Sequence, residues 1–298
     1  MASAAKPREM HGASSVGPEK VYAGQPLIYS EWVELAGEEV VDISAISLPR
    51  IDGFRVNEIS GIVPERKSNS DPLCIALRSF ILMPVATDSV IEVGGGGYQI
   101  SHRVPRRVYD PVMGDGIAYT IETKDVWTPQ RKVRVRPLPS HAPKAFGGLI
   151  GEYTLSYLLP PDGVEAGGEA SFAIRLSGKG FLEEEKLPNL QVQLPSSLGS
   201  RRVEVAPQVR LSLDGIESVA DFVCEFTATD STVIQLPELQ LTVFNPRKGK
   251  YEVVKAAPAE LKVRKSKPKQ RVSTLYVRRD EIDDTDPEWL AALDYEIL

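Results

Sequence analysis

The chain has 298 residues, a net charge of −6, 42% apolar residues and 26% charged residues. This length allows two domains of ordinary size, and the apolar content excludes an intrinsically disordered chain. No stretch approaches the about 20 apolar residues of a membrane-spanning helix, while the 23 glycines and 23 prolines favour short strands joined by turns.

The first 17 residues predict no complete folded element. They contain charged residues but lack the apolar stretch of an intact signal peptide. We therefore expect a disordered start or the remnant of a strand.

Residues 18–140 predict a first immunoglobulin-like β-sandwich domain. Six segments have strand-like composition and are separated by turn residues: 27–35, 73–83, 90–93, 98–101, 118–121 and 133–135. The glycine run 94–97 lacks the Gly-Lys-Ser/Thr ending of a phosphate-binding loop. We expect it to be a flexible hairpin connection.

Residues 141–270 predict a second immunoglobulin-like β-sandwich domain. In the segment 153–159, Tyr153, Leu155 and Tyr157 alternate with polar residues, which is typical of a strand with one buried face. Further strands are predicted at 172–176, 222–226, 239–243 and 251–253. The preceding linker, 137–143, has three prolines, so we expect extended backbone with limited freedom.

Residues 271–298 are predicted to be a linker and an acidic tail with a short helix. Asp286 before Pro287 is typical of a helix start, and apolar residues follow at helical spacing from Trp289. From Asp280 onward there are eight acidic residues and no lysine or arginine. Charges in the rest of the chain nearly balance, so the basic surface that a nucleic acid requires is not expected.

Four short matches in the same order predict that one domain is duplicated. The matches pair Pro18, Val21, Ala23 and Gly24 with Pro161, Val164, Ala166 and Gly167, then 48–49 with 187–188, 86–89 with 228–231, and 132–134 with 262–264. The strand 153–159 corresponds to residues 10–16, which are poor strand formers. Either the first domain lacks this edge strand, or the chain was cut near it.

Residues suited to chemistry are scattered. His11, His102 and His141 lack the spacing of a zinc site, and the acidic run 183–185 lacks a second carboxylate at a defined separation. Cys74 and Cys224 provide no disulfide framework and are expected to be buried apolar side chains. The sequence therefore predicts no enzyme, no metal site and no cofactor.

The joint between the two copies is more distinctive. Residues 135–139, Pro143 and the segment 146–153 (Phe-Gly-Gly-Leu-Ile-Gly-Glu-Tyr) resemble the segment that links successive domains in the BatD family of bacterial aerotolerance proteins. The similarity extends from Val21 to Val263 through turns such as 176–180, 187–190 and 244–251. The chain departs from the family pattern in the 177–180 loop, where the family usually has Gly-Asn, and at Asn245, where it has Asp.

The resemblance implies the extracytoplasmic part of a protein that is anchored in the membrane by a segment outside this sequence. Its implied partners are von Willebrand factor A domain proteins and a MoxR-type ATPase system, in an envelope complex linked to stress and oxygen tolerance. The expected function is a non-catalytic protein–protein interaction module. The alternative is a pair of accessory domains that bind a glycan or substrate in a secreted enzyme or adhesin system.

The tail offers one candidate partner-binding site. It contains Asp280, Glu281, Asp283 and Asp284, followed by Trp289. Since von Willebrand factor A domains commonly hold a divalent ion that accepts a partner's carboxylate, the resemblance implies that the tail could dock on such an ion, with Trp289 as an anchor. The alternative is a solvated spacer that leads to the membrane segment.

Overall fold

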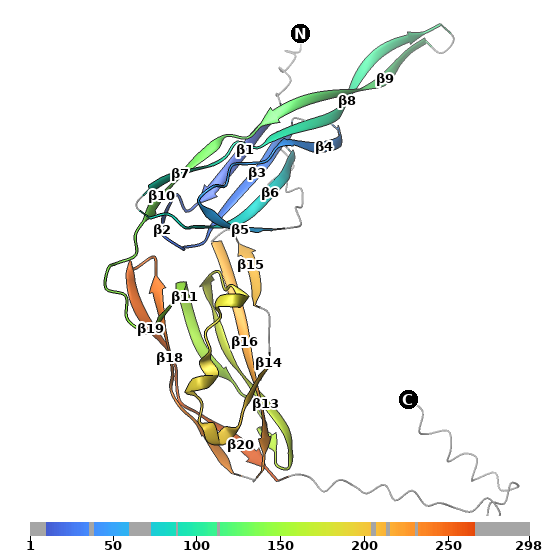
Figure 1. Cartoon of the computed structure of the whole chain (residues 1–298). Helices are drawn as coiled ribbons and strands as arrows, with labels where there is room; N and C mark the ends of the chain where they lie inside the picture. The colour runs from blue at the N-terminus through green and yellow to red at the C-terminus, as the bar shows by residue number, and fades with distance from the viewer. Residues whose placement is uncertain are drawn as a thin grey trace, which may run out of the picture.

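The computed structural model describes residues 10–35, 39–59, 73–87, 89–111, 114–203, 207–212, 215–229 and 232–265. These residues form two tandem antiparallel β-sandwiches, with helical backbone only in three short 3-10 turns between Glu184 and Leu198 (Figure 1). The predicted all-β fold of tandem immunoglobulin-like sandwich domains is confirmed. The predicted acidic helix lies outside the described residues, among which no helix is long and apolar enough to cross a membrane.

The first sandwich packs a four-stranded sheet against a three-stranded sheet. The four-stranded sheet has the order β1 (His11–Gly17), β3 (Leu27–Leu35), β6 (Leu73–Pro84) and β5 (Phe54–Glu58). The facing sheet consists of β2 (Lys20–Tyr22), β10 (Gln130–Arg136) and β7 (Ser89–Gly94), with β2 parallel to β10. Side chains such as Leu27, Leu82 and Val133 are fully buried between them, as the alternating pattern of these strands requires.

The second sandwich repeats this arrangement. Its larger sheet has the order β14 (Arg201–Val203), β16 (Gly215–Ala228), β13 (Gly168–Gly180), β11 (Phe146–Leu158), β18 (Leu239–Asn245) and β19 (Lys250–Ala256), and β15 (Gln208–Ser212) also pairs with β16. The smaller sheet consists of β12 (Val164–Glu165), β20 (Ala259–Arg264) and β17 (Val233–Leu236). Parallel pairing of β12 with β20 matches that of β2 with β10, and the neighbours β11, β13, β16 and β14 correspond to β1, β3, β6 and β5, so the same strand order predicted for the two domains is observed.

The register corrects one of the sequence matches. Val21 lies opposite Val135, and Val164 lies opposite Val263, so Val263 is equivalent to Val135 and not to Val133. The match of 132–134 with 262–264 is therefore displaced by two residues. Charged and apolar residues alternate over 132–136 and over 259–264, and a shift of two residues keeps every side chain on its own face, so the local pattern could not exclude it.

Of the two alternatives that the sequence left open for residues 10–16, a missing edge strand or a chain cut near it, the missing edge strand is wrong. β1 pairs with β3 over seven residues, and its Ser14 hydroxyl donates a hydrogen bond of 2.7 Å to the Pro129 carbonyl. Its small side chains have a packing role, because a Cβ atom at Gly12 would lie 2.5 Å from the Trp127 carbonyl oxygen. Backbone pairing and close packing define this strand, and neither appears in an apolar pattern.

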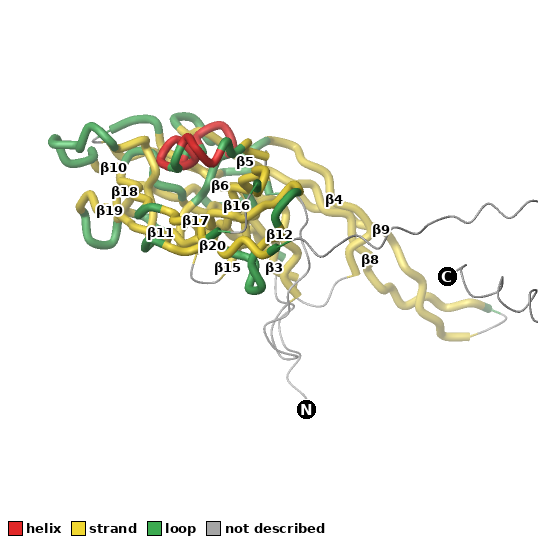
Figure 2. Tube along the Cα trace, turned by 90° about the horizontal axis from the view of Figure 1, so that it is seen from below, coloured by secondary structure: helices red, strands yellow, loops and turns green. Residues whose placement is uncertain are grey.

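A long hairpin projects from the first sandwich. Its strands, β8 (Gly97–Asp110) and β9 (Gly114–Trp127), have 14 residues each and pair along their whole length. β4 (Glu39–Ser47) pairs with β8 only as far as Arg103. In both views the distal part of the hairpin extends beyond the body of the protein (Figures 1 and 2), and we call β8 and β9 together the arm.

Aromatic side chains join the two sandwiches. The ring of Tyr22 meets that of Phe244 edge to face, with 4.8 Å between the centroids, and Tyr251 packs on Phe244 at 5.2 Å. The Tyr251 hydroxyl donates a hydrogen bond of 3.1 Å to the carbonyl of Pro139 in the linker. The joint is thus held by side-chain packing as well as by the prolines that the sequence contains.

Candidate functional site

The histidines singled out in the sequence lie in different parts of the chain. His11 contacts Glu34 at 3.0 Å, His102 is buried on the inner side of β8, and His141 lies 3.0 Å from the Ser140 hydroxyl in the linker. Nowhere in the described ranges do three or more histidine, cysteine or acidic side chains form a group that could hold a metal ion.

The other sequence candidates have structural surroundings. Glu183 forms ion pairs with Arg55 at 2.6 Å and with Lys186 at 3.0 Å, so it links the two sandwiches. Cys224 is buried in the second core, as predicted. The tail candidates Asp280, Glu281, Asp283, Asp284 and Trp289 lie outside the described residues.

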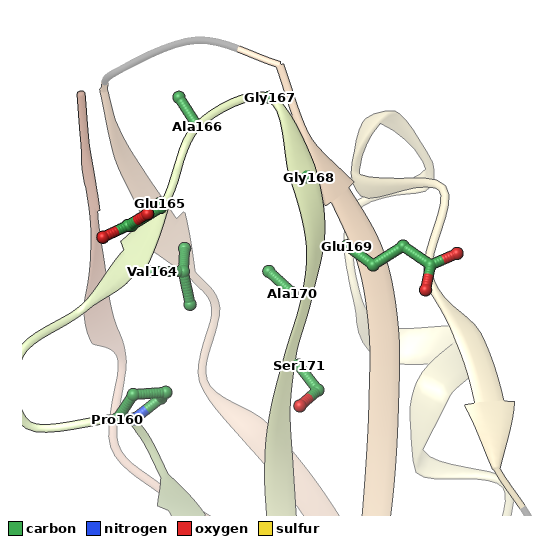
Figure 3. Close-up of a pocket in the computed structure, with 9 residues that line it drawn as sticks. All are labelled: Pro160, Val164, Glu165, Ala166, Gly167, Gly168, Glu169, Ala170 and Ser171. Atoms are coloured by element: carbon green, nitrogen blue, oxygen red, sulfur yellow. The ribbon is translucent and has the colours of Figure 1, made fainter. Parts of the chain in front are cut away.

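A depression at the far end of the second sandwich also lacks a convergent polar set. It is lined by Pro160 and by residues 164–171 around the turn between β12 and β13. Its two carboxylates, Glu165 and Glu169, point in opposite directions, and the side chains between them are small (Figure 3). Such a surface provides no paired acid and base for catalysis.

The distal arm carries several exposed large apolar side chains. Three pairs of opposite residues in the hairpin direct their side chains to the same side: 103 with 121, 105 with 119, and 107 with 117. We call this surface the arm face; it comprises Arg103, Pro105, Arg107, Tyr109, Ile117, Tyr119 and Ile121. Its large apolar side chains are 64–75% exposed, namely Tyr109, Ile117, Tyr119 and Ile121.

The opposite side of the arm has a different character. Near the sandwich, its Tyr98, Ile100 and Val126 side chains are buried in a small core with Val33. Farther out, Arg106 and Glu122 form an ion pair of 2.7 Å. The inner side of the arm is therefore packed or charge-paired, while large apolar side chains accumulate on the arm face.

A buried carboxylate fastens the base of the arm. Glu31 in β3 is fully buried and accepts four hydrogen bonds. The donors are the Tyr29 hydroxyl at 2.6 Å, the Tyr98 and Thr128 hydroxyls at 2.5 Å each, and the Gly96 N–H at 3.2 Å. Since Tyr98 belongs to β8 and Thr128 directly follows β9, this cluster connects both strands of the arm to the sandwich.

The tyrosines of this cluster are held in their neutral form. Burial, followed by the nearby Glu31 carboxylate, raises the pKa of Tyr29 and of Tyr98 well above the ordinary value of 10.0. Both hydroxyls therefore remain protonated and can donate to Glu31 throughout the physiological pH range. A buried carboxylate is costly unless its oxygens accept such bonds.

The glycine run that joins β7 to β8 is part of the same cluster. A Cβ atom at Gly94, which has a φ of +105°, would approach the Tyr29 hydroxyl, and one at Gly96 would lie 2.6 Å from the Glu31 carboxylate. The prediction of a flexible hairpin was wrong, because β7 and β8 do not pair with each other. The run is a tightly packed bend that carries the chain from β7 in one sheet to β8 in another.

The second sandwich lacks the polar cluster at the equivalent positions. Gly24 and Gly167 occupy equivalent turns after β2 and β12, and counting from them along the next strand makes Ile174 the equivalent of Glu31. Like Glu31, Ile174 is fully buried. The sequence did contain a signal: Glu31 stands at an inward position between Tyr29 and Val33 in a strand that was correctly predicted, where an unpaired acid would be unfavourable.

No protein-family model matches the chain, and no curated protein matches it. Among solved structures, it is similar to the collagen adhesin (CNA) from S. aureus, at 9% identity over 84% of this chain and 93% of that chain, with a TM-score of 0.22. It is also similar to an ICAM-5 D1–D4 ectodomain fragment, at 10% identity over 87% of this chain and 78% of that chain, with a TM-score of 0.16. Similarities of this strength carry no argument about function.

Proposed function

We propose that this protein is a non-catalytic interaction module that binds another protein through the arm face. The observation that carries the proposal is the exposure of Tyr109, Ile117, Tyr119 and Ile121 on one side of the arm. Contiguous apolar surface of this kind typically marks an interaction site. Tyrosine and arginine, which both occur in the arm face, are enriched among residues that dominate binding energy.

The rigid base of the arm supports the proposal. A binding surface gains affinity when it is held in its bound conformation before the partner arrives, because less conformational entropy is lost. Glu31 and its four donors hold the base in one arrangement. The arm is thus a stiff projection that carries an apolar surface away from the rest of the protein.

We propose further that the partner belongs to a bacterial envelope complex that contains von Willebrand factor A domain proteins and a MoxR-type ATPase. This proposal rests on the resemblance of residues 135–153 and the turns that follow to the BatD family. The implied location is extracytoplasmic, and the implied role is in stress and oxygen tolerance.

The test is direct binding of the full chain to a purified von Willebrand factor A domain protein, measured by calorimetry. Ile117→Ser with Ile121→Ser is expected to weaken binding at least about tenfold, because two central apolar contacts are lost. Val108→Ser is the matched control, since Val108 is 44% exposed on the opposite side of the arm. Equal affinity of all three proteins would contradict a role for the arm face.

Docking of the acidic tail on a metal ion of the partner, which the resemblance implies, is tested in the same assay. If Asp280, Glu281, Asp283 and Asp284 dock on a metal ion of the partner, EDTA should weaken binding of the full chain but not of a chain that ends at Arg279. Equal affinities with magnesium and with EDTA for both chains would leave the tail as a spacer.

Glycan binding is the second candidate, and one observation favours it. Trp127, Tyr119 and Tyr109 are 57–75% exposed, and their register places all three on the same side of the arm. Isoleucines lie between these rings, and they neither stack on sugars nor form hydrogen bonds, so a protein partner is favoured. Binding of the chain to a glycan array, with loss in Tyr119→Ser, would reverse this preference.

A further inference from the structure

The outer edge of the arm is the longest strand edge without a partner strand in the described part of the chain. β9 has 14 residues, stands last in the sheet order β4-β8-β9, and has all its register partners in β8. Every second residue of an edge strand directs its N–H and C=O groups outward. A long edge of this kind is a template for another strand.

Other edges in the first sandwich have features that oppose pairing, and β9 has few. β8 carries Pro105, which has no N–H group, and three arginines. In β1, the carbonyl of Ser14 already accepts a hydrogen bond of 2.6 Å from Arg131. The β9 segment 116–121 (Gly-Ile-Ala-Tyr-Thr-Ile) has no charge and no proline, and it is rich in residues that favour strands.

The segment is also nearly the same when it is read in either direction from Tyr119. Ile117 and Ile121 lie two residues on either side, and the small residues Ala118 and Thr120 lie next to it. A two-fold symmetric interface requires such self-complementarity, because each residue at a distance from the axis meets the residue at the same distance on the other side.

We propose that β9 pairs antiparallel with β9 of a second copy of this chain, about a two-fold axis at Tyr119. In this register Ile117 lies opposite Ile121 of the second copy, and Asp115 lies opposite Thr123. The four strands then follow the order β8-β9-β9-β8, and the two arm faces join into one apolar surface. This dimer does not depend on the identity of the partner proposed above.

Charge selects this register over its neighbours. With the axis at Thr120, Asp115 of each copy would lie opposite Asp125 of the other, and directly opposed like charges are unfavourable. With the axis at Ala118, Asp115 would lie opposite the apolar Ile121. Of these three registers, only the one with the axis at Tyr119 pairs isoleucine with isoleucine and leaves no acid opposite an acid.

The experiment compares two double variants of the full chain that change the same two positions. Ile117→Lys with Ile121→Lys places lysine opposite lysine in the proposed register, whereas Ile117→Glu with Ile121→Lys places glutamate opposite lysine. Sedimentation velocity is expected to show a dimer for the unaltered chain and for the Glu/Lys variant. The Lys/Lys variant should have a dimer dissociation constant at least about tenfold larger, and circular dichroism should show that both variants are folded.

Both variants replace the isoleucines that the proposed partner contact uses, so both should lose partner binding while only one loses the dimer. This difference separates failure of the dimer from failure of the proposed function. The proposal would be overturned if the unaltered chain were monomeric at its highest soluble concentration. Equal dimer dissociation constants for the two variants would also overturn it. The register is tested by Tyr119→Cys, which should form a disulfide-linked dimer on mild oxidation, whereas Thr123→Cys should not.

Discussion

Replacing Glu31 with alanine is expected to destabilise the first sandwich severely. The change leaves the Tyr29, Tyr98 and Thr128 hydroxyls and the Gly96 N–H without their acceptor in a fully buried site. Each buried donor without a partner costs about 1–3 kcal/mol. Loss of the carboxylate's own desolvation penalty offsets part of this sum, as does the Gly96 carbonyl, which lies 3.3 Å from the Thr128 hydroxyl.

We expect a net loss of about 3–5 kcal/mol, which is the low end of the combined cost of four unpaired buried donors once these offsets are taken into account. This is a large part of the about 5–15 kcal/mol that stabilises a typical domain. Glu31→Gln should cost less, about 1–2 kcal/mol, because one acceptor oxygen remains and the tyrosine hydroxyls can turn to accept from the amide.

The assay is urea unfolding followed by tryptophan fluorescence in a Trp289→Phe background. The two remaining tryptophans, Trp32 and Trp127, both lie in the first sandwich, so the signal reports on that domain. Glu92→Ala is the control, because Glu92 makes only an exposed ion pair of 3.5 Å with Lys132 and should cost at most about 1 kcal/mol. If Glu31→Ala costs no more than this control, the cluster does not stabilise the fold as argued.

Three other predictions concern the same cluster and the joint. Since the pKa values of Tyr29 and Tyr98 are raised by the fold, these two groups should add no pH dependence to the stability below about pH 10 and should lower it by up to about 1.4 kcal/mol per pH unit for each tyrosine above that pH; a urea midpoint at about pH 11 equal to that at about pH 9 would contradict this. Gly96→Ala should lower stability by about 2–4 kcal/mol, because its Cβ meets the Glu31 carboxylate; a midpoint equal to that of the unaltered chain would show that the bend can yield. Phe244→Ala removes the ring on which Tyr22 packs and should broaden the interdomain distances seen by small-angle X-ray scattering; an unchanged scattering curve would show that the linker alone sets the geometry.

The sequence predicted the strands of the two cores well, because their side chains alternate between a buried and a solvated face. The predicted segment 27–35 coincides with β3, and 73–83 is one residue shorter than β6. The parallel pairing of β2 with β10 and of β12 with β20 was not predicted. The matching residues around Val21 and Val164 nevertheless placed β2 and β12 correctly in equivalent positions.

The arm was underestimated for a physical reason. The segments 98–101 and 118–121 were predicted as short strands, while β8 and β9 have 14 residues each. Their distal halves are exposed on both sides, so Arg106 and Glu122 on one side and Tyr119 on the other produce no alternation of apolar and polar residues. Hairpin pairing holds these strands together, and a pattern of burial cannot reveal it.

The candidate site was missed for a related reason. Sequence reasoning sought groups of polar residues close in the chain, and so it considered the run 183–185, which it set aside, and favoured the tail around Asp280. The arm face combines two strands that meet only through register, and Glu31 gathers donors as distant in sequence as Thr128. Proximity of this kind depends on the topology of the fold.

The comparison of the two copies connects the buried carboxylate with the arm. The two sandwiches carry corresponding hairpins, β8 with β9 and β18 with β19, but the second hairpin has only seven residues in each strand. It does not leave the core, because Leu239, Leu241 and Val243 of β18 are buried in it. The short hairpin also pairs through β18 with β11, whereas the distal arm has no strand beside it among the described residues. Because the arm is long, a force on its tip produces a large bending moment at its base. At this base the first sandwich has the hydrogen-bonded Glu31, where the second sandwich has Ile174. Directional bonds resist bending better than apolar contacts, which can slide. The buried acid is therefore best understood as the structural requirement of a long, exposed and stiff arm, and it supports the function that we propose for the arm face.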